Sequence, residues 1–186
     1  MKKVIAMLVL FSTGVFAQQK GTFTDSRDNK TYKAVKIAQT WWMAENLNYA
    51  VSGSKCYDNN SWNCTKYGRL YDWNAAMRAC PYGWHLPSDA EWNLLMAAVG
   101  GEETAREKLK VPSFGGTDDY GFSALPGGGG GAGGFFYDVG DYGWWWCASE
   151  ISSSLAYSRF MDYYDERASS GSQSKSALFS VRCVKD

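Results

Sequence analysis

The chain has 186 residues, and its 19 lysines and arginines balance its 19 aspartates and glutamates, so the formal net charge is zero. This balance excludes the strongly basic surface that binds nucleic-acid phosphates and the acidic, solvated chain of a disordered tail. Apolar residues make up 45% of the sequence and aromatic residues 16%, which indicates a chain that folds around a core, because disordered chains are poor in aromatics. The length predicts one domain.

Residues 1–17 (MKKVIAMLVLFSTGVFA) have the pattern of a secretory signal peptide. Two lysines form a positive start, an apolar run follows, and Val15 and Ala17 lie three and one positions before the expected cleavage site. The apolar run is too short for a membrane-spanning helix, which needs about 20 residues. The sequence therefore predicts an exported protein, in the periplasm, at the cell surface or outside the cell. Its mature chain, residues 18–186, is expected to contain no membrane span.

The mature chain begins with an extended segment. Residues 22–38 (TFTDSRDNKTYKAVKIA) predict a hairpin, because residues 31–37 alternate in polarity as a strand does. The extended segment continues through Trp41, Trp42 and Met43, which are expected in the core.

Two main helices are expected after this segment. Asp72 is an N-cap residue for the first helix, which the following proline must end at residue 80. The clearest helix follows Ser88, because Ser88 and Glu91 have the spacing of a capping box. Trp92 lies in phase with later apolar residues, so it is expected in the core. Residues 102–109 predict a short second helix at the end of this one.

Beyond Val111 the helical periodicity stops and glycine becomes frequent. Short strands in a small antiparallel sheet are expected here, joined by long glycine-rich loops, and this order of elements indicates the α+β class. The run LPGGGGGAGG contains GxGxxG, but a dinucleotide site needs a strand before the run and a helix after it. A flexible loop is therefore predicted. The predicted strands are residues 122–125, 144–149, 155–163 and 178–184, and the loops are residues 127–134, 138–143 and 169–176.

All five cysteines follow the expected cleavage site, and export permits disulfides. Cys56 and Cys64 bracket a polar stretch, where a disulfide would staple a hairpin loop that is too polar to hold itself by burial. A bond between Cys80 and Cys183 would close more than half of the chain into a loop, which stabilises by restricting the unfolded state. Cys147 is left over, as a buried free thiol, an intermolecular disulfide or a reactive group.

Four segments carry a family pattern. They are GTFTDSRDNKTYKAVKIAQTWWMAENLNY (21–49), CTKYGRLYDWNAAMRACPYGWHLPSDAEWNLLMAAVGG (64–101), TDDYGFSALPGG (117–128) and FSVRCVKD (179–186). These segments resemble the Fibrobacter succinogenes major paralogous domain, a module of exported bacterial proteins that has no established activity. The resemblance covers almost all of the mature chain and predicts a single such domain over residues 18–186.

The resemblance implies a C-type-lectin-like fold, shared with sulfatase-modifying, formylglycine-generating enzymes. LPSDAEW is similar to the LPTEAEW segment of those enzymes. In such folds a cysteine on a helix is bonded to one in the last strand, which here implies Cys80–Cys183. The termini are expected to meet in one small sheet, with long loops at the other end. The family tends to have serine at the position of Cys147, which makes that residue peculiar to this chain.

An enzyme related to the formylglycine-generating proteins is the alternative function. Those enzymes use thiols, but this chain lacks their RGGSW segment, a second thiol near Cys147 and a cation close to it in sequence. His85 is the single histidine, and a structural role is expected for it, because a triad or a zinc site needs further partners. No catalytic residue, metal site or cofactor is therefore predicted.

Acidic loop residues could supply oxygen ligands for Ca²⁺, but the EPN, QPD and WND motifs of sugar-binding C-type lectins are absent. Solvated loop acids are the favoured interpretation, with Asp118 and Asp119 bracing the loop before Tyr120 as an alternative. The acids considered for Ca²⁺ are Asp118, Asp119, Asp138 and Asp141.

The aromatic stretch at residues 135–146 is the strongest candidate for a binding surface. Mixtures of tyrosine, serine, glycine and aspartate suit binding loops, because they combine rigid aromatic contact with adaptable hydrogen bonds. Alternation along the strand sends Trp145 to the face opposite its tryptophan neighbours, so one face can be exposed. The alternative is that these rings pack the fold. The candidate ligand-binding residues are Tyr142, Trp145, Tyr163, Asp138 and Asp141.

The sequence thus predicts an exported, non-enzymatic binding module. Its ligand, a carbohydrate or a protein of the cell envelope, is expected on the loops of residues 114–176. A purely structural envelope component is a further alternative.

Overall fold

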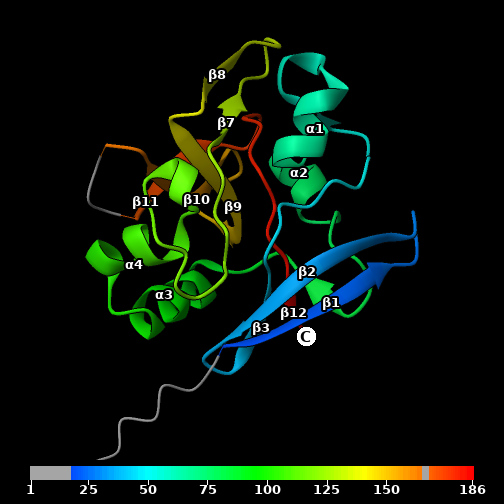
Figure 1. The fold of residues 1–186 in the computed structure, drawn as a ribbon. Coiled ribbons are helices and arrows are strands. Elements are labelled where there is room, and N and C mark those ends of the chain that lie inside the picture. Colours follow the sequence, from blue (N-terminus) through cyan, green and yellow to red (C-terminus); the bar gives the residue numbers. More distant parts are fainter. Residues whose placement is uncertain (1–17, 165–167) are drawn as a thin grey trace, which may run out of the picture.

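The computed structural model describes residues 18–164 and 168–186, which form two five-stranded sheets, one two-stranded sheet and four α-helices (Figure 1). The predicted α+β class is confirmed, although the described residues contain four helices where two main ones were expected. The predicted signal peptide lies outside the described residues, as do residues 165–167. None of the described helices is long and apolar enough to cross a membrane.

The first sheet joins the two ends of the described chain. Its strands are all antiparallel and follow the order β1-β2-β3-β12-β6. β1 and β2 form the hairpin predicted from their alternating residues, and β12 lies between β3 and β6, so the last residues of the chain complete this sheet (Figure 1). The strands are β1 (Gln19–Asp25), β2 (Lys30–Ile37), β3 (Thr40–Met43), β6 (Trp84–His85) and β12 (Val184–Lys185).

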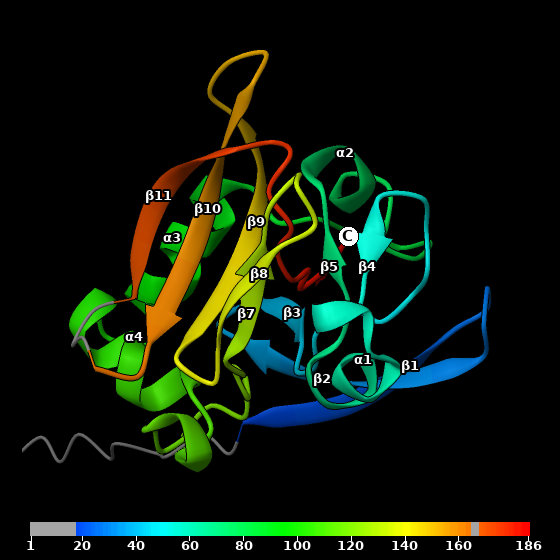
Figure 2. The same cartoon turned by 90° about the horizontal axis from the view of Figure 1, so that it is seen from above.

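The second sheet comes from the second half of the chain, in the order β11-β10-β9-β7-β8. β7 and β9 are parallel, and the other neighbours are antiparallel. Figure 2 shows β9, β10 and β11 side by side, with α3 and α4 against one face. The strands are β7 (Gly127–Gly130), β8 (Phe136–Val139), β9 (Tyr142–Glu150), β10 (Leu155–Asp162) and β11 (Ser169–Ser174).

Helix α3 (Asp89–Ala98) begins where the capping box predicts. Ser88 Oγ accepts the backbone N–H of Glu91, and the Glu91 carboxylate accepts the backbone N–H of Ser88, so two free donors at the helix start are satisfied. α4 (Glu102–Leu109) follows, as predicted. Trp92 is fully buried and packs 4.9 Å from Trp42 and 6.3 Å from Trp145, between ring centroids. The prediction that Trp92 is a core residue is confirmed.

The helix predicted after Asp72 is shorter than expected. α2 (Trp73–Ala76) ends after four residues. Beyond Met77, the N–H groups of Arg78 and Ala79 bond three residues back instead of four. This tighter turn brings Cys80 to Cys183. The remaining elements of this region are β4 (Ser54–Lys55), η1 (Tyr57–Asn59), α1 (Ser61–Tyr67), β5 (Leu70–Tyr71) and, after α4, η2 (Pro112–Phe114).

The structure contains both expected disulfides. Cys80 and Cys183 are 103 residues apart and join the end of the α2 turn to the segment before β12, with a Cα–Cα distance of 5.9 Å. Cys56 and Cys64 have a Cα–Cα distance of 5.0 Å. The segment between Cys56 and Cys64 is not the predicted hairpin loop, because η1 and α1 occupy it and Cys64 lies within α1.

The first half of the glycine run is not the predicted flexible loop, whereas residues 131–134 belong to the connection between β7 and β8. Residues 127–130 form strand β7, and all four glycines are buried. Gly128 has φ = +65°, and a Cβ atom there would lie 2.5 Å from Tyr137 O and 2.9 Å from the Tyr57 ring. Glycine is therefore required, because the neighbouring strand and an aromatic ring approach the backbone too closely for any side chain.

Other predicted elements of the second half also differ. Most of the predicted loop at residues 169–176 is strand β11. Its polar side chains are typical of a loop, but its backbone pairs with β10. The loop at residues 138–143 shrinks to a turn between β8 and β9. Of the strand predicted at residues 178–184, β12 is the regular part. Residues 178–183 hydrogen-bond to several different segments instead of to one partner strand. The strand predicted at residues 122–125 is reduced to one isolated bridge, at Ala124.

Candidate functional site

The structure brings four of the five predicted binding residues to the β8–β9 turn and the end of β10. Asp138 lies near the end of β8 with a positive φ of 62°, and the backbone N–H of Asp141 donates to its carbonyl at 3.2 Å. Tyr142 begins β9, and the N–H of Tyr163 donates to Asp141 O at 2.9 Å. Both aspartates are exposed. Partial desolvation of its carboxylate by neighbouring atoms and the charge of Asp141 raise the pKa of Asp138.

Trp145 is not part of an exposed platform, so its prediction as a ligand-binding residue is wrong. Its side chain is fully buried, and its indole N–H donates to Asn46 Oδ1 at 2.9 Å. Alternation along β9 does not expose either face, because α3 covers the face of Trp145 and the C-terminal segment covers Trp146, which packs on Phe179. Trp145 is therefore a core residue with a satisfied polar atom.

The two tyrosines of the predicted platform differ in exposure. Tyr142 is half-buried and stacks on Trp144, with ring centroids 5.7 Å apart. Tyr163 is 47% exposed and lies edge-on to Tyr164, which is 76% exposed. Tyr163 and Tyr164 therefore offer aromatic surface to solvent, whereas Tyr142 mainly supports the sheet.

The acidic loop residues are not gathered into a metal centre in the described part of the chain. No cluster of three or more His, Cys, Asp or Glu side chains suited to a metal ion is found there. Asp118 braces its loop, the alternative that the sequence left open: its carboxylate accepts the N–H and the hydroxyl of Ser123, both at 2.7 Å. Asp119 is exposed.

Cys147 is a free thiol on β9 and is fully buried. Burial raises the pKa of this thiol to about 12, and Arg159, from the neighbouring strand β10, only partly offsets the effect. The sequence shows no cation near Cys147, and the pairing of β9 with β10 supplies one. The thiol is nevertheless protonated at neutral pH, which is not the state of a nucleophilic cysteine.

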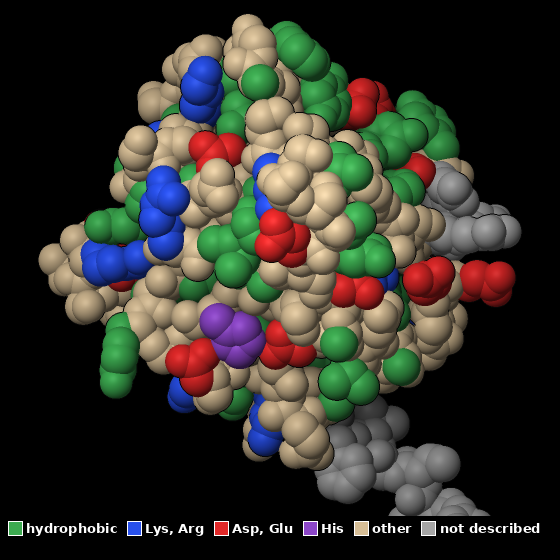
Figure 3. Space-filling view, turned by 180° about the vertical axis from the view of Figure 1, so that it is seen from behind, with side chains coloured by type: hydrophobic (Ala, Val, Ile, Leu, Met, Phe, Trp, Pro, Cys, Tyr) green, Lys and Arg blue, Asp and Glu red, His purple; other side chains and the backbone are tan. Residues whose placement is uncertain are grey.

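His85 lies between two carboxylates on one face of the molecule. Figure 3 shows the single histidine at the surface with acidic side chains on both sides. Its Nδ1 is 2.6 Å from Asp186 Oδ1, and its Nε2 is 2.8 Å from Glu91 Oε1. Both ring nitrogens therefore bond to carboxylates, and these bonds connect β6 to α3 and to Asp186. This arrangement indicates a structural role for His85.

A cleft of about 540 Å³ lies elsewhere, and none of the five predicted binding residues lines it. Figure 2 shows the β7–β8 connection and the segment after β11 converging on α2. Tyr142 and Glu150, the two ends of β9, are about 26 Å apart for a rise of about 3.3 Å per residue. The cleft adjoins the Glu150 end of β9, because Glu150 pairs with the lining residue Lys175. Its lining residues are Gly53, Ser54, Lys55, Asp72, Asn74, Gly131, Ala132, Ser154, Ser174, Lys175, Ser176 and Leu178.

The side chains of the cleft offer both donors and acceptors. Asp72 Oδ1 accepts the N–H of Ala75 at 2.7 Å, which caps α2 and fixes the carboxylate at the wall. Asn74 is exposed, so its amide can both donate and accept. The hydroxyls of Ser174 and Ser176 are 2.8 Å apart. The resulting surface suits a ligand whose own groups donate and accept hydrogen bonds.

A lysine lines the cleft, and an exposed aromatic ring lies beside it. Lys175 pairs with Glu150, donates to Ser153 O at 3.3 Å and lies 4.3 Å from the centre of the Trp73 ring. Phe135 is 62% exposed and lies so close to Gly131 that a Cβ atom on this glycine would be 2.4 Å from the ring. An exposed aromatic face therefore stands beside a polar cleft.

Sequence reasoning missed this cleft because five separate segments build it. In the sequence, Asp72 has only the pattern of a helix cap, and the serines near residue 175 only that of a polar loop. The signals are present as a serine-rich stretch and an aromatic residue after the glycine run. What brings them together is the pairing of β7, β9, β10 and β11 in one sheet and of β4 with β5, next to α2, in another.

The fold and its two disulfides define a disulfide-bonded α+β domain, with two five-stranded sheets around an aromatic core. The family model described as the Fibrobacter succinogenes major domain matches residues 35–185. The chain therefore belongs to this family, as its sequence motifs indicate. Comparison with curated proteins and with solved structures gave no match.

Proposed function

We propose that the protein is an exported, non-enzymatic binding module that holds a carbohydrate in the cleft between α2, the β7–β8 connection and the segment after β11. The observation that carries this proposal is the composition of the cleft. Sugar hydroxyls donate and accept hydrogen bonds, and Asp72, Asn74 and the serines offer complementary groups. The volume of about 540 Å³ falls within the range of about 300–1,000 Å³ for small-molecule sites.

The aromatic ring beside the cleft supports the same ligand class. Phe135 exposes most of its side chain, and an exposed aromatic ring offers a flat apolar surface at low entropic cost. A sugar ring presents flat apolar faces and a polar rim, so a ring stacked on Phe135 can direct its hydroxyls toward the adjoining cleft.

Three features support export and a lectin-like architecture. Disulfides persist in oxidising compartments, and two are present. The terminal strands share one sheet, the long disulfide ties the α2 region to the end of the chain, and the cleft lies among connections, an arrangement expected of a C-type-lectin-like fold. The pattern at residues 1–17 supports secretion through a signal peptide.

The enzymatic alternative has little support in the site. Cys147 is buried and protonated, and both nitrogens of His85 are bonded to carboxylates. A purely structural envelope component would need neither the polar cleft nor the exposed ring, so the cleft favours binding.

The test is a screen of the purified protein against immobilised polysaccharides, followed by calorimetric titration of any ligand found. Asn74→Ala and Phe135→Ala should each weaken binding by about ten-fold, the loss of about 1.4 kcal/mol expected for one polar or stacking contact. Tyr82→Ala is the matched control, because Tyr82 is an exposed aromatic that does not line the cleft. All three variants should keep the wild-type melting temperature.

Tyr163→Ala tests the surface at the β8–β9 turn. If binding is lost in Tyr163→Ala and kept in Phe135→Ala, the ligand lies at the turn and the cleft proposal is wrong. If no polysaccharide binds, the carbohydrate assignment is refuted.

A further inference from the structure

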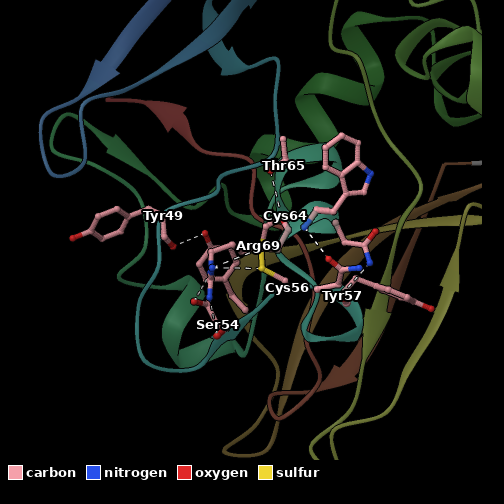
Figure 4. The surroundings of a disulfide bond; sticks show 12 residues. Tyr49, Ser54, Cys56, Tyr57, Cys64, Thr65 and Arg69 are labelled. Carbon is pink, nitrogen blue, oxygen red and sulfur yellow. Dashed lines mark hydrogen bonds between the residues drawn. A yellow bond between two sulfur atoms is a disulfide. The ribbon is translucent and has the colours of Figure 1, made fainter.

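The Cys56–Cys64 disulfide has an arginine against both of its sulfur atoms. Arg69 Nη1 lies 3.7 Å from Cys56 Sγ and 3.6 Å from Cys64 Sγ (Figure 4). Arg69 is the residue before β5, and strand β4 holds its side chain in place: Nε donates to Ser54 Oγ at 3.0 Å and Nη2 donates to Ser54 O at 3.4 Å. The guanidinium is therefore fixed at the disulfide by bonds that do not involve sulfur.

The Cys80–Cys183 disulfide has different surroundings. Cys183 is fully buried in an apolar cluster, and no arginine or lysine contact to either of its sulfurs is found among the described residues. The nearby Arg27 donates to the Cys80 carbonyl instead, at 3.3 Å. The Cys80–Cys183 disulfide closes a segment of 103 residues, whereas Cys56 and Cys64 are 8 residues apart. Reduction of Cys80–Cys183 therefore releases far more conformational entropy of the unfolded chain.

Access to the short disulfide is through Cys56. Cys56 is half-buried, while Cys64 is only 5% exposed and lies within α1. An external thiolate can therefore approach Cys56, and the sulfur that leaves is the sheltered one of Cys64, which faces Arg69.

We propose that Cys56–Cys64 is a site of thiol–disulfide exchange with low-molecular-weight thiols. The external thiolate attacks Cys56 Sγ and forms a mixed disulfide, the Cys56–Cys64 bond breaks, and its electron pair leaves with Cys64 as a thiolate. A second external thiolate attacks the small-molecule sulfur of the mixed disulfide and releases Cys56. Two external thiols are oxidised to one disulfide, and their two protons end on Cys56 and Cys64.

Arg69 favours this exchange in two ways. A guanidinium beside a sulfur stabilises the thiolate, which makes Cys64 a better leaving group. The same contact stabilises the reduced pair relative to the disulfide, so the exchange equilibrium shifts toward reduction. Arg69 thus acts as a positioning and charge-stabilising residue at the sulfurs.

The experiment equilibrates the purified protein with a series of reduced and oxidised glutathione ratios, followed by alkylation and peptide mass spectrometry of each cysteine pair. Cys56–Cys64 should be reduced at a lower ratio of reduced to oxidised glutathione than Cys80–Cys183. Arg69→Met should lower the exchange constant of Cys56–Cys64 on the order of ten-fold, equivalent to about 30 mV, and leave Cys80–Cys183 unchanged.

Two further variants separate charge from structure. Arg69→Lys keeps the charge and should retain most of the wild-type exchange constant. Ser54→Ala removes a bond to Arg69 Nε but keeps the guanidinium, so it should change the constant less than Arg69→Met does. A merely loosened loop would make reduction easier, which is the opposite direction.

An unchanged or larger exchange constant in Arg69→Met, or reduction of Cys80–Cys183 before Cys56–Cys64, overturns the proposal. The measurement contains no carbohydrate, so its outcome is independent of the proposed cleft.

Discussion

The glycine run provides a sharp test of the fold, because two of its glycines have opposite surroundings. Gly128 lies in buried strand β7 with φ = +65°, and an added Cβ atom would be 2.5 Å from Tyr137 O. Gly133 lies in the exposed β7–β8 connection, where the nearest atom to an added Cβ, in the Phe135 ring, is 3.4 Å away. Gly128→Ala should therefore lower the free energy of unfolding, and Gly133→Ala should not.

The magnitude follows from three contributions at Gly128. The left-handed conformation costs an alanine about 1–2 kcal/mol, and crowding against a packed neighbour costs about 1–3 kcal/mol. Alanine also restricts the unfolded chain, which stabilises by about 0.4–1 kcal/mol at either position. Gly128→Ala should lose roughly 3 kcal/mol, with a range of roughly 1–5 kcal/mol. Gly133→Ala should be neutral or gain up to about 1 kcal/mol.

Urea unfolding followed by tryptophan fluorescence measures both variants, with both disulfides kept oxidised and the m-values compared with the wild type. The buried tryptophans of the core report the global transition. If residues 127–134 formed a flexible loop, both alanines would behave alike. Equal free energies of unfolding for the two variants would refute the assignment of β7 as a buried strand.

Three further predictions concern the core, the long disulfide and the histidine. Trp92→Ala should cost about 3–5 kcal/mol in urea unfolding, because it empties the space between Trp42 and Trp145. Cys183→Ala should cost about 2–5 kcal/mol, and a wild-type midpoint in the same assay would contradict the role of the long disulfide. Burial lowers the pKa of His85, but its bonds to Asp186 and Glu91 outweigh this and raise it. The folded-state pKa therefore lies above the unfolded value of about 6.5, so the stabilisation is complete below that pH and is lost as the pH rises through the raised pKa. Melting temperatures of His85→Gln and the wild type should differ at pH 5.5 and converge at alkaline pH; a constant difference would contradict this.

Local rules account for the parts of this protein that the sequence predicts well. The β1–β2 hairpin follows from alternation along a few residues, and the start of α3 follows from Ser88 and Glu91, which satisfy each other within one turn. The family motifs lie in the same segments and are sufficient to indicate the family. For the hairpin and the helix start, the interaction that decides the structure lies between residues close in sequence.

Tertiary contacts decided the rest. The burial of Trp145 depends on α3 covering its face of the sheet, and alternation along β9 carries no information about a helix from a much earlier part of the chain. Residues 127–130 of the glycine run form a strand against which Tyr57 and Tyr137 pack, although glycine by itself favours loops. The cleft exists only where five separate segments meet, each of which looks like an ordinary cap, turn or polar loop in the sequence. Burial and site formation are properties of the whole packing arrangement, and local sequence patterns contain only the side chains that take part in it.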